Sequence, residues 1–168
     1  FHMEMQAGAP PDYYIATGQN WRFPTYNWEA MAKDGYKWWR QRMEHLGNYF
    51  DAIRIDHVLG FFRIWSIPVA NKTGTLGIFQ PAISIADTLF KENGISIDKQ
   101  RFCKPFINKE IIETHFKDKA DWVTHTFLDN GSFKSTFNTQ ASIAAFFEKN
   151  PEHKNLEQAL QFLLTNVL

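Results

Sequence analysis

Arg54 and Asp56 lie in the short stretch AIRID (52–56), where two charged residues alternate with isoleucines. Side chains two residues apart in a strand share one face, so a strand is predicted with Ile53 and Ile55 on one face and the charged pair on the other. A carboxylate at the carboxyl end of a barrel strand can act as nucleophile or general base, and a nearby arginine favours its ionised form. The spacing alone, however, favours a buried ion pair that only holds the strand end in place.

The charge balance favours an uncharged partner over a nucleic acid or an anionic membrane surface. The chain contains 18 Lys and Arg against 18 Asp and Glu, so it has no basic excess. All five Tyr and five of the six Trp fall within the first 65 residues, close in sequence to the charged pair. Because aromatic rings fill cores more often than they bind ligands, Trp38 and Trp39 are predicted to be core or helix-face residues.

Cysteine, histidine and apolar patterns predict neither a metal site nor a membrane segment. The single Cys103 can form neither an internal disulfide nor a zinc site of several thiolates, which favours a reducing compartment. The six His show no metal-binding spacing. No apolar run is long enough to span a bilayer, and the N-terminal stretch lacks a signal-peptide pattern. A cytoplasmic protein without a metal or organic cofactor is therefore expected.

Three predicted elements would position the charged pair. Residues 7–26 contain two Gly and three Pro, which predicts a long irregular loop. Asn27 is predicted to cap a short helix that ends at Lys33, and after a break that begins at Asp34 a second helix follows to about residue 49. Helical spacing places the following apolar residues of this region on one face: Trp28, Ala32, Trp39, Met43, Leu46 and Phe50.

The pattern changes after residue 68. Residues 69–85 are loop-like, and several short helices with recognisable start signals follow. A turn is predicted at Asn130 and Gly131. The predicted helix starts are Ser84, for a helix to Asn93 that Gly94 ends; Asn108 or Asp118, for KEIIETHF and KADWVTHTFL; Thr139, for QASIAAFFEK; and a capping box of Asn155 with Gln158 for the last helix.

Two longer motifs carry a family resemblance. GAPPDYYIATGQNWRFPTYNW (8–28) and RIDHVLGFFRIWSIP (54–68) closely resemble the amylomaltases, the 4-alpha-glucanotransferases of glycoside hydrolase family seventy-seven in the alpha-amylase clan. The resemblance covers roughly the first eighty residues, and the continuation is similar to the larger plant cytosolic type. It implies a helix-rich α/β fragment of a (β/α)8 TIM barrel, with residues 1–83 belonging to the catalytic barrel and 84–168 to a mainly helical insertion, truncated at its C-terminal end.

The resemblance also implies roles for individual residues. Asp56 matches the catalytic nucleophile, and Arg54 matches the arginine that orients it and keeps it ionised. The other matching positions are Asp12, Trp21 and His57, which line donor sugar subsites; Tyr13 and Tyr14, which belong to a mobile aromatic loop that covers the bound glucan; and Arg63 and Trp65, which pack and position the site.

Two catalytic carboxyl groups of the resembled family are missing from this sequence. Its Glu acid/base and its second Asp occur in motifs similar to EDLG and HD, and neither motif is present. The chain is therefore expected to be an inactive piece of a longer enzyme that transfers alpha-1,4-glucan units from maltose or maltodextrins to an acceptor sugar, with the rest of the parent chain as its partner. Two alternatives stay open at this stage: a glucan hydrolase of the same clan, and a non-catalytic carbohydrate-binding or structural module.

Overall fold

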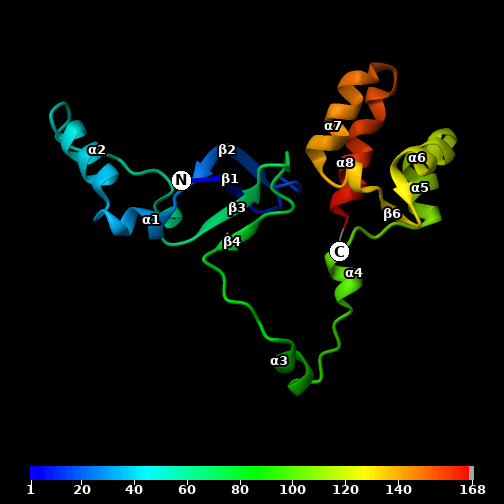
Figure 1. Ribbon diagram of the computed structural model, residues 1–168, viewed down its shortest axis with the longest axis horizontal. Helices are drawn as coiled ribbons and strands as arrows, with labels where there is room; N and C mark the ends of the chain where they lie inside the picture. Colours follow the sequence, from blue (N-terminus) through cyan, green and yellow to red (C-terminus); the bar gives the residue numbers. More distant parts are fainter. Residues whose placement is uncertain (167–168) are drawn as a thin grey trace. The chain divides into compact units, whose positions relative to one another are not determined.

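A computed structural model describes residues 1–166, including all side chains except those at positions 99 and 100. Its helices and strands form two compact units, the first made of residues 1–69 and 73–82, and the second of residues 70–72 and the chain from 83 onward (Figure 1). The mixture of helices and strands agrees with the expected class in its coarse form. Among the described residues no helix is long and apolar enough to cross a membrane.

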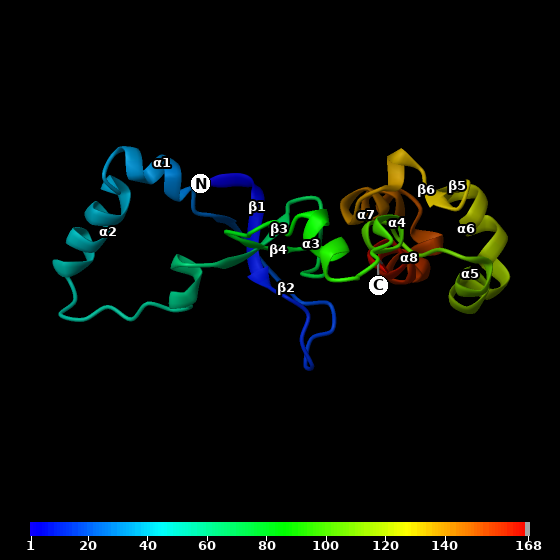
Figure 2. The same ribbon diagram turned by 90° about the horizontal axis from the view of Figure 1, so that it is seen from below.

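The first unit is built on a four-stranded antiparallel sheet with the strand order β2-β1-β3-β4. Gly8 of the first strand pairs with Asn20 on one side and with Trp65 on the other. Figure 2 shows the connection between the first two strands extending away from the sheet. The strands are β1 (His2–Ala9), β2 (Gln19–Thr25), β3 (Ile64–Pro68) and β4 (Ile78–Gln80).

The predicted loop over residues 7–26 is therefore wrong in part: residues 7–9 and 19–25 lie in strands, and residues 10–18 and Tyr26 stay outside them. Gly8 lies inside a strand at a position where a side chain would not fit: a Cβ there would lie 2.0 Å from the carbonyl oxygen of Gln19. Gly18 adopts a φ of 64°, in the region that favours glycine. Both glycines thus serve the pairing of two strands, which local composition does not reveal.

Two helices and a 3-10 turn complete the first unit: α1 (Trp28–Lys33), α2 (Lys37–Gly47) and η1 (Val58–Phe61). The predicted cap is confirmed, since the Asn27 side chain accepts a hydrogen bond from the Ala30 amide at 2.9 Å. The break at Asp34 is confirmed as well, and its carboxylate accepts from the Lys37 amide at 3.1 Å.

The predicted strand over residues 52–56 is not formed. These residues are irregular in backbone conformation, and no described strand pairs with them. A strand is stable only when a neighbour satisfies its amide and carbonyl groups, and the alternation of isoleucines with charges cannot supply that neighbour. Ile53 and Ile55 remain 42% and 48% exposed. Arg54 and Asp56 are thus carried by an extended connection between α2 and η1.

The second unit is helical around one apolar core. Phe127, Phe147, Ile143, Leu160 and Leu163 are all fully buried there. Its helices are α3 (Asp87–Glu92), α4 (Lys99–Cys103), α5 (Lys109–Phe116), α6 (Ala120–Phe127), α7 (Gln140–Lys149) and α8 (Glu157–Thr165), with 3-10 turns η2 (Lys117–Lys119), η3 (Ser135–Phe137) and η4 (Pro151–Leu156) and a hairpin of β5 (Leu128–Asp129) and β6 (Ser132–Phe133).

Helix starts in this unit test the predicted caps. Asn108 caps α5, accepting from the Ile111 amide at 2.8 Å, and the turn at Asn130 and Gly131 is confirmed by the β5–β6 hairpin. Three predicted starts are wrong. The helix after Ser84 begins at Asp87, α6 starts from Lys119 without a side-chain cap, and α8 starts from Leu156. Pro151 opens a 3-10 turn that runs through Asn155, so no N-cap is formed there.

Thr139 and Asn155 offer a matched test of capping. Thr139 accepts from the Ser142 amide at 3.1 Å, and the Ser142 hydroxyl bonds back to the Thr139 amide, so a capping box is present. We expect Thr139→Ala to lower the free energy of unfolding by about 1 kcal/mol. Asn155→Ala should change it by less than about 0.5 kcal/mol. Urea unfolding of both variants measures this, and equal losses would contradict the assignment of the caps.

Glu157 is a nearly buried carboxylate between two lysines. Its side chain is 13% exposed, lies 3.5 Å from Lys72 Nζ and forms an ion pair with Lys154. Burial by itself raises the pKa of Glu157, but the hydrogen bond and charge of Lys154, with those of Lys72, outweigh it and hold the pKa below its ordinary value.

A carboxylate with a lowered folded-state pKa stabilises the fold above its unfolded pKa, and that contribution is lost as the pH falls through the folded value. We therefore expect Glu157→Gln to destabilise the chain at pH 7, with the difference from the wild type shrinking below about pH 4.3. Urea unfolding at pH 7, 5 and 3.5 measures this. Glu152→Gln, at an exposed position of η4, is the control and should show no such pH dependence.

Candidate functional site

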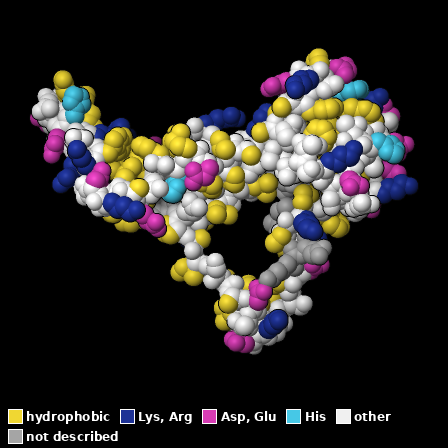
Figure 3. Space-filling model, in the orientation of Figure 1, with side chains coloured by type: hydrophobic (Ala, Val, Ile, Leu, Met, Phe, Trp, Pro, Cys, Tyr) yellow, Lys and Arg dark blue, Asp and Glu magenta, His cyan; other side chains and the backbone are white. Residues whose placement is uncertain are grey.

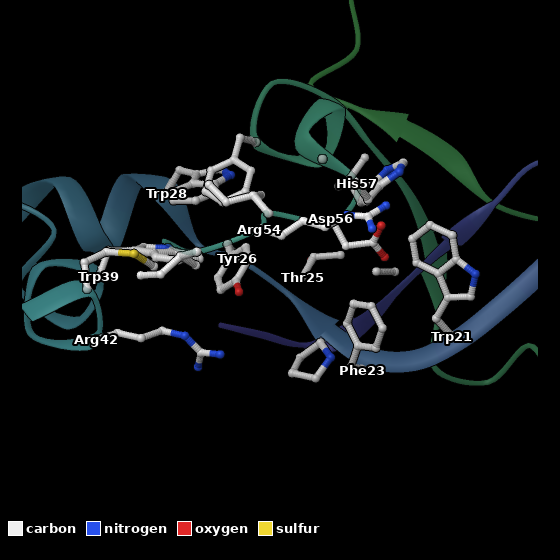
Figure 4. A pocket seen from close by; sticks show the side chains of 18 of the residues that line it. Trp21, Phe23, Thr25, Tyr26, Trp28, Trp39, Arg42, Arg54, Asp56 and His57 are labelled. Carbon is white, nitrogen blue, oxygen red and sulfur yellow. The ribbon is translucent and has the colours of Figure 1, made fainter. Parts of the chain in front are cut away.

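The first unit contains a pocket of about 790 Å³ that brings four of the predicted site residues together. These are Trp21, Arg54, Asp56 and His57 (Figure 4). Strand β2, helices α1 and α2, the 52–57 connection and η1 all contribute to its wall. The other lining residues are Ala7, Phe23, Pro24, Thr25, Tyr26, Trp28, Trp39, Arg42, Met43, Leu46, Ile53, Ile55, Gly60, Phe61 and Ile64.

Asp56 presents its carboxylate to open space. The side chain is exposed, and in Figure 4 its oxygens point toward the gap beside Trp21 and Phe23. Arg54 lines the same pocket, yet no ion pair of 4.0 Å or less joins it to Asp56 in the described part of the chain. The two residues thus do not form the buried ion pair that their spacing favoured, and Arg54 does not orient the carboxylate by a direct contact in this structure.

His57 lies beside Asp56 in an unusual backbone conformation. Its φ of 50° and ψ of 53° place it in the left-handed region, where it begins η1. This conformation turns the imidazole back over the turn and against Trp21, whose ring centroid is 5.0 Å away with the planes at 80°. Trp21 in turn stacks on Phe23 at 5.9 Å and 25°. One end of the pocket is therefore a wall of flat rings next to the carboxylate.

The opposite end of the pocket is a second aromatic cluster that sequence reasoning did not assign to the site. Tyr26 packs against Trp28 and Trp39 with centroid distances of 4.9 and 5.3 Å, and Phe61 lies 5.1 Å from Trp39. The Arg42 guanidinium lies over the face of Trp39 at 6.0 Å. The signal was available in part, because the predicted helix face contains four residues that line the pocket: Trp28, Trp39, Met43 and Leu46.

Three further predicted residues lie on the loop between β1 and β2 rather than in the pocket wall. Tyr13 and Tyr14 are 95% and 89% exposed, with their rings in edge contact at 5.4 Å. Asp12 shapes the loop, since its carboxylate accepts from the amides of Tyr14 and Ile15 at 2.9 and 2.7 Å. The Thr75 hydroxyl holds the base of the loop through the Thr17 carbonyl at 3.1 Å.

Arg63 and Trp65, the last two predicted residues, also lie outside the pocket wall. The Arg63 guanidinium covers the ring of Phe79 at 4.2 Å, and Trp65 meets the same ring at 4.9 Å. Trp65 donates a hydrogen bond to the Gly74 carbonyl at 2.8 Å. These contacts join β3 to β4 and to the loop between them, so both residues pack the sheet.

The chemistry of the pocket suits a ligand with hydroxyl groups and apolar faces. Its wall consists mostly of aromatic and aliphatic side chains, and its polar groups include one carboxylate, one imidazole, two guanidinium groups and the hydroxyls of Thr25 and Tyr26. Aromatic faces pack well against the C–H faces of a sugar ring, and the polar groups can bind its hydroxyls. Among the described residues no group of three potential metal ligands occurs.

Comparison with known proteins gives a consistent result. The family model for 4-alpha-glucanotransferases, glycoside hydrolase family seventy-seven, matches residues 1–92, more than half of the chain. The 4-alpha-glucanotransferase DPE2 of Oryza sativa subsp. japonica is 42% identical over 161 residues, which is 93% of this chain and 17% of that protein. The 4-alpha-glucanotransferase of Aquifex aeolicus is 35% identical over 147 residues, which is 88% of this chain and 27% of that protein.

The matches cover different shares of the chain. The 4-alpha-glucanotransferase of Streptococcus pneumoniae serotype 4 is 49% identical over 71 residues, 42% of this chain and 14% of that protein. The amylomaltase of Streptococcus agalactiae in complex with acarbose aligns with a TM-score of 0.45 and 23% identity over 90% of this chain and 35% of that chain, too low a likeness to bear on the fold. This chain spans about a sixth of the rice relative and about a quarter of the Aquifex one. By the family match over residues 1–92, the chain belongs to the 4-alpha-glucanotransferases of glycoside hydrolase family seventy-seven.

Proposed function

We propose that the full-length protein transfers alpha-1,4-glucan or glucosyl units from maltose or maltodextrins to an acceptor sugar, with Asp56 as its nucleophile. The observation that carries the proposal is the open aromatic pocket of the first unit, in a chain that belongs to this family. The pocket wall contains a single carboxylate, that of the exposed Asp56. A balanced net charge and a wall of rings fit a neutral glucan.

The proposed reaction is a retaining double displacement. An oxygen of the Asp56 carboxylate attacks the anomeric carbon, the bond from that carbon to the leaving glycosidic oxygen breaks, and the oxygen takes a proton from a carboxylic acid. The acceptor hydroxyl then attacks the anomeric carbon, gives its proton to that carboxylate, and the ester bond to Asp56 breaks. The acid/base and a third carboxyl group are proposed to come from parts of the protein outside this chain.

The remaining predicted residues have proposed places around the donor sugar. Trp21 and His57, which meet edge to face at 5.0 Å, would line the donor subsite together with Asp12. Arg54 would approach Asp56 once the donor and the rest of the catalytic domain are in place, because a guanidinium beside it favours the ionised nucleophile. Arg63 and Trp65 would hold the sheet beneath the site through Phe79.

The loop carrying Tyr13 and Tyr14 is proposed to act as a lid. Both rings are exposed, the loop is anchored at its base by Thr75, and neither tyrosine is among the residues that line the pocket. A transferase must keep water away from the glycosyl intermediate until the acceptor sugar arrives, and an aromatic loop that closes over the glucan would do this.

The finer fold assignment is also a proposal. We propose that residues 1–83 belong to a (β/α)8 barrel and that 84–168 are a helical insertion in it, in a cytoplasmic enzyme. The match of the family model to residues 1–92 supports the first part. The rice relative matches nearly the whole chain, whereas the pneumococcal one matches 71 residues, which supports an insertion that only some members carry.

Incubation of the full-length protein with maltotriose tests the proposed function. We expect glucose together with maltooligosaccharides longer than maltotriose, because the glucosyl or maltosyl unit leaves on a second sugar. Chromatography of the products at early times measures this. Glucose and maltose without longer products would show that water takes the glycosyl unit, and the protein would then be a hydrolase of the same clan.

A further inference from the structure

Gly60 stands where the backbone does not require a glycine. It lies inside η1, and its φ is outside the left-handed region that the chain's glycines at 18, 35, 94 and 131 adopt. An alanine at this position would therefore meet no conformational penalty from the backbone. Some other feature of the surroundings must account for the missing side chain.

The feature that fills the space is the ring of His57. A Cβ built on Gly60 would lie 2.8 Å from His57 Cδ2 and 3.3 Å from Ile64 Cδ1. A carbon–carbon contact of 2.8 Å is well inside the ordinary separation of about 3.5 Å or more, so the ring would have to move. The imidazole can move by rotating about its two side-chain bonds, whereas the η1 backbone is held by the amide of Gly60, which donates to the His57 carbonyl at 2.9 Å.

Packing is the restraint that the structure places on this ring. In the described chain no hydrogen bond reaches either imidazole nitrogen, and the ring is bounded by Trp21 on one side and by the surface of Gly60 on the other. His57 lines the pocket, and neither of its ring nitrogens is committed to a hydrogen bond within the described chain. Because only packing holds the ring, a methyl group added at Gly60 is expected to displace it.

We infer that Gly60 is a positioning residue: its missing side chain leaves the space that sets the His57 imidazole against Trp21 and beside Asp56, where it can bind hydroxyl groups of the donor sugar. The role of Gly60 in glucan transfer rests on the proposed function. Its effect on the position of the His57 ring does not. Gly60 is part of the pocket wall, and in this scheme its effect on the donor sugar is exerted through the position of the His57 ring.

The first experiment measures glucan transfer by the full-length protein with maltotriose as donor. Gly60→Ala is expected to lower kcat/KM by about tenfold or more, because a displaced binding group loses alignment with the donor. Gly47→Ala is the matched control: its Cβ would meet no atom within 4 Å and its φ is ordinary, so activity should stay at the wild-type value.

The second experiment removes the ring with which the new methyl group would clash. If Gly60 acts through His57, then His57→Ala and the double variant His57→Ala/Gly60→Ala should have equal kcat/KM within about twofold. A further large loss in the double variant would overturn the inference. If Gly60→Ala alone fails to fold, the double variant should recover folding, and its failure to do so would overturn the inference equally.

The third measurement does not depend on activity. The ring signal of His57 in a carbon-13 NMR spectrum, assigned by its loss in His57→Ala, should shift in Gly60→Ala and stay unchanged in Gly47→Ala. An unmoved signal with unchanged kcat/KM would overturn the placement. Should the wild type instead show no transfer at all, the proposed function fails on its own, and the shift of the ring signal still tests the inference.

Discussion

Asp56→Asn is expected to lower glucan transfer by the full-length protein by about 10⁴-fold or more, because an amide cannot form the glycosyl ester on which a double displacement depends. The substitution keeps the size of the side chain, and the exposed position makes no packing contact whose loss would unfold the protein. Initial rates with maltotriose, corrected for any contaminating wild type, measure the loss.

A carboxylate in the same connection provides the control. Asp51 is exposed, lies five positions earlier and is not part of the pocket wall. Asp51→Asn should therefore keep wild-type activity. Retained turnover in Asp56→Asn would assign the pocket to a structural or binding role, whereas equal losses in both variants would indicate an effect on folding. Donor binding adds a further distinction, since removal of a nucleophile is expected to reduce kcat more than affinity.

The capping signals show what local sequence determines in this chain. Asn27, Asn108 and Thr139 were predictable as helix starts because a capping side chain and the amides it binds lie within three residues of each other. The last helix shows the limit of this reasoning. Asn155 and Gln158 have the right spacing, but Pro151 begins a 3-10 turn that covers the expected N-cap, and the helix starts after it.

Strands depend on partners that local sequence does not specify. The glycines and prolines of residues 7–26 predict a loop, yet Gly8 pairs with Asn20 and Trp65 from both sides. The alternating stretch 52–56 predicts a strand, yet no described strand lies beside it. In both cases the outcome depends on pairing between distant segments, and a periodicity of two indicates only which residues could share a face.

The candidate site likewise has one part that local sequence predicts and one part that depends on contacts between distant segments. Arg54, Asp56 and His57 are neighbours in sequence, so a short motif places them together whatever the surrounding fold. The Trp39 and Arg42 side of the pocket depends on the position of α2 relative to the sheet, which helical spacing alone does not predict.

Figure 3 shows hydrophobic side chains gathered on the surface of the first unit. Among its described residues, the buried hydrophobic ones are Ala7 and Ile67. Much of the apolar surface of the first unit is therefore exposed to solvent, and the aromatic pocket is part of that exposed surface.

In the core of the second unit, one fully buried ring contacts several others. Phe127 is fully buried and packs against four other rings: Phe137 at 4.7 Å, Phe146 at 5.0 Å, Trp122 at 5.7 Å and Phe147 at 5.8 Å. Truncation to alanine removes these contacts and leaves a cavity that helices α6 and α7 cannot fill without moving. Phe127→Ala is therefore expected to destabilise this unit by about 3–5 kcal/mol.

Amide hydrogen exchange is the measurement that locates this loss. A destabilisation of about 3 kcal/mol corresponds to a fall in protection of about a hundredfold, which we expect for the slowest amides of α6, α7 and α8. Phe162→Ala is the control: the same residue type in α8 is 51% exposed, and its truncation should change protection by less than about threefold. Equal effects of the two substitutions would mean that the aromatic cluster around Phe127 does not hold the unit together. Because this cluster draws on three elements, α6, η3 and α7, a selective effect of Phe127→Ala would show that packing between elements, more than the caps of single helices, determines the stability of the second unit.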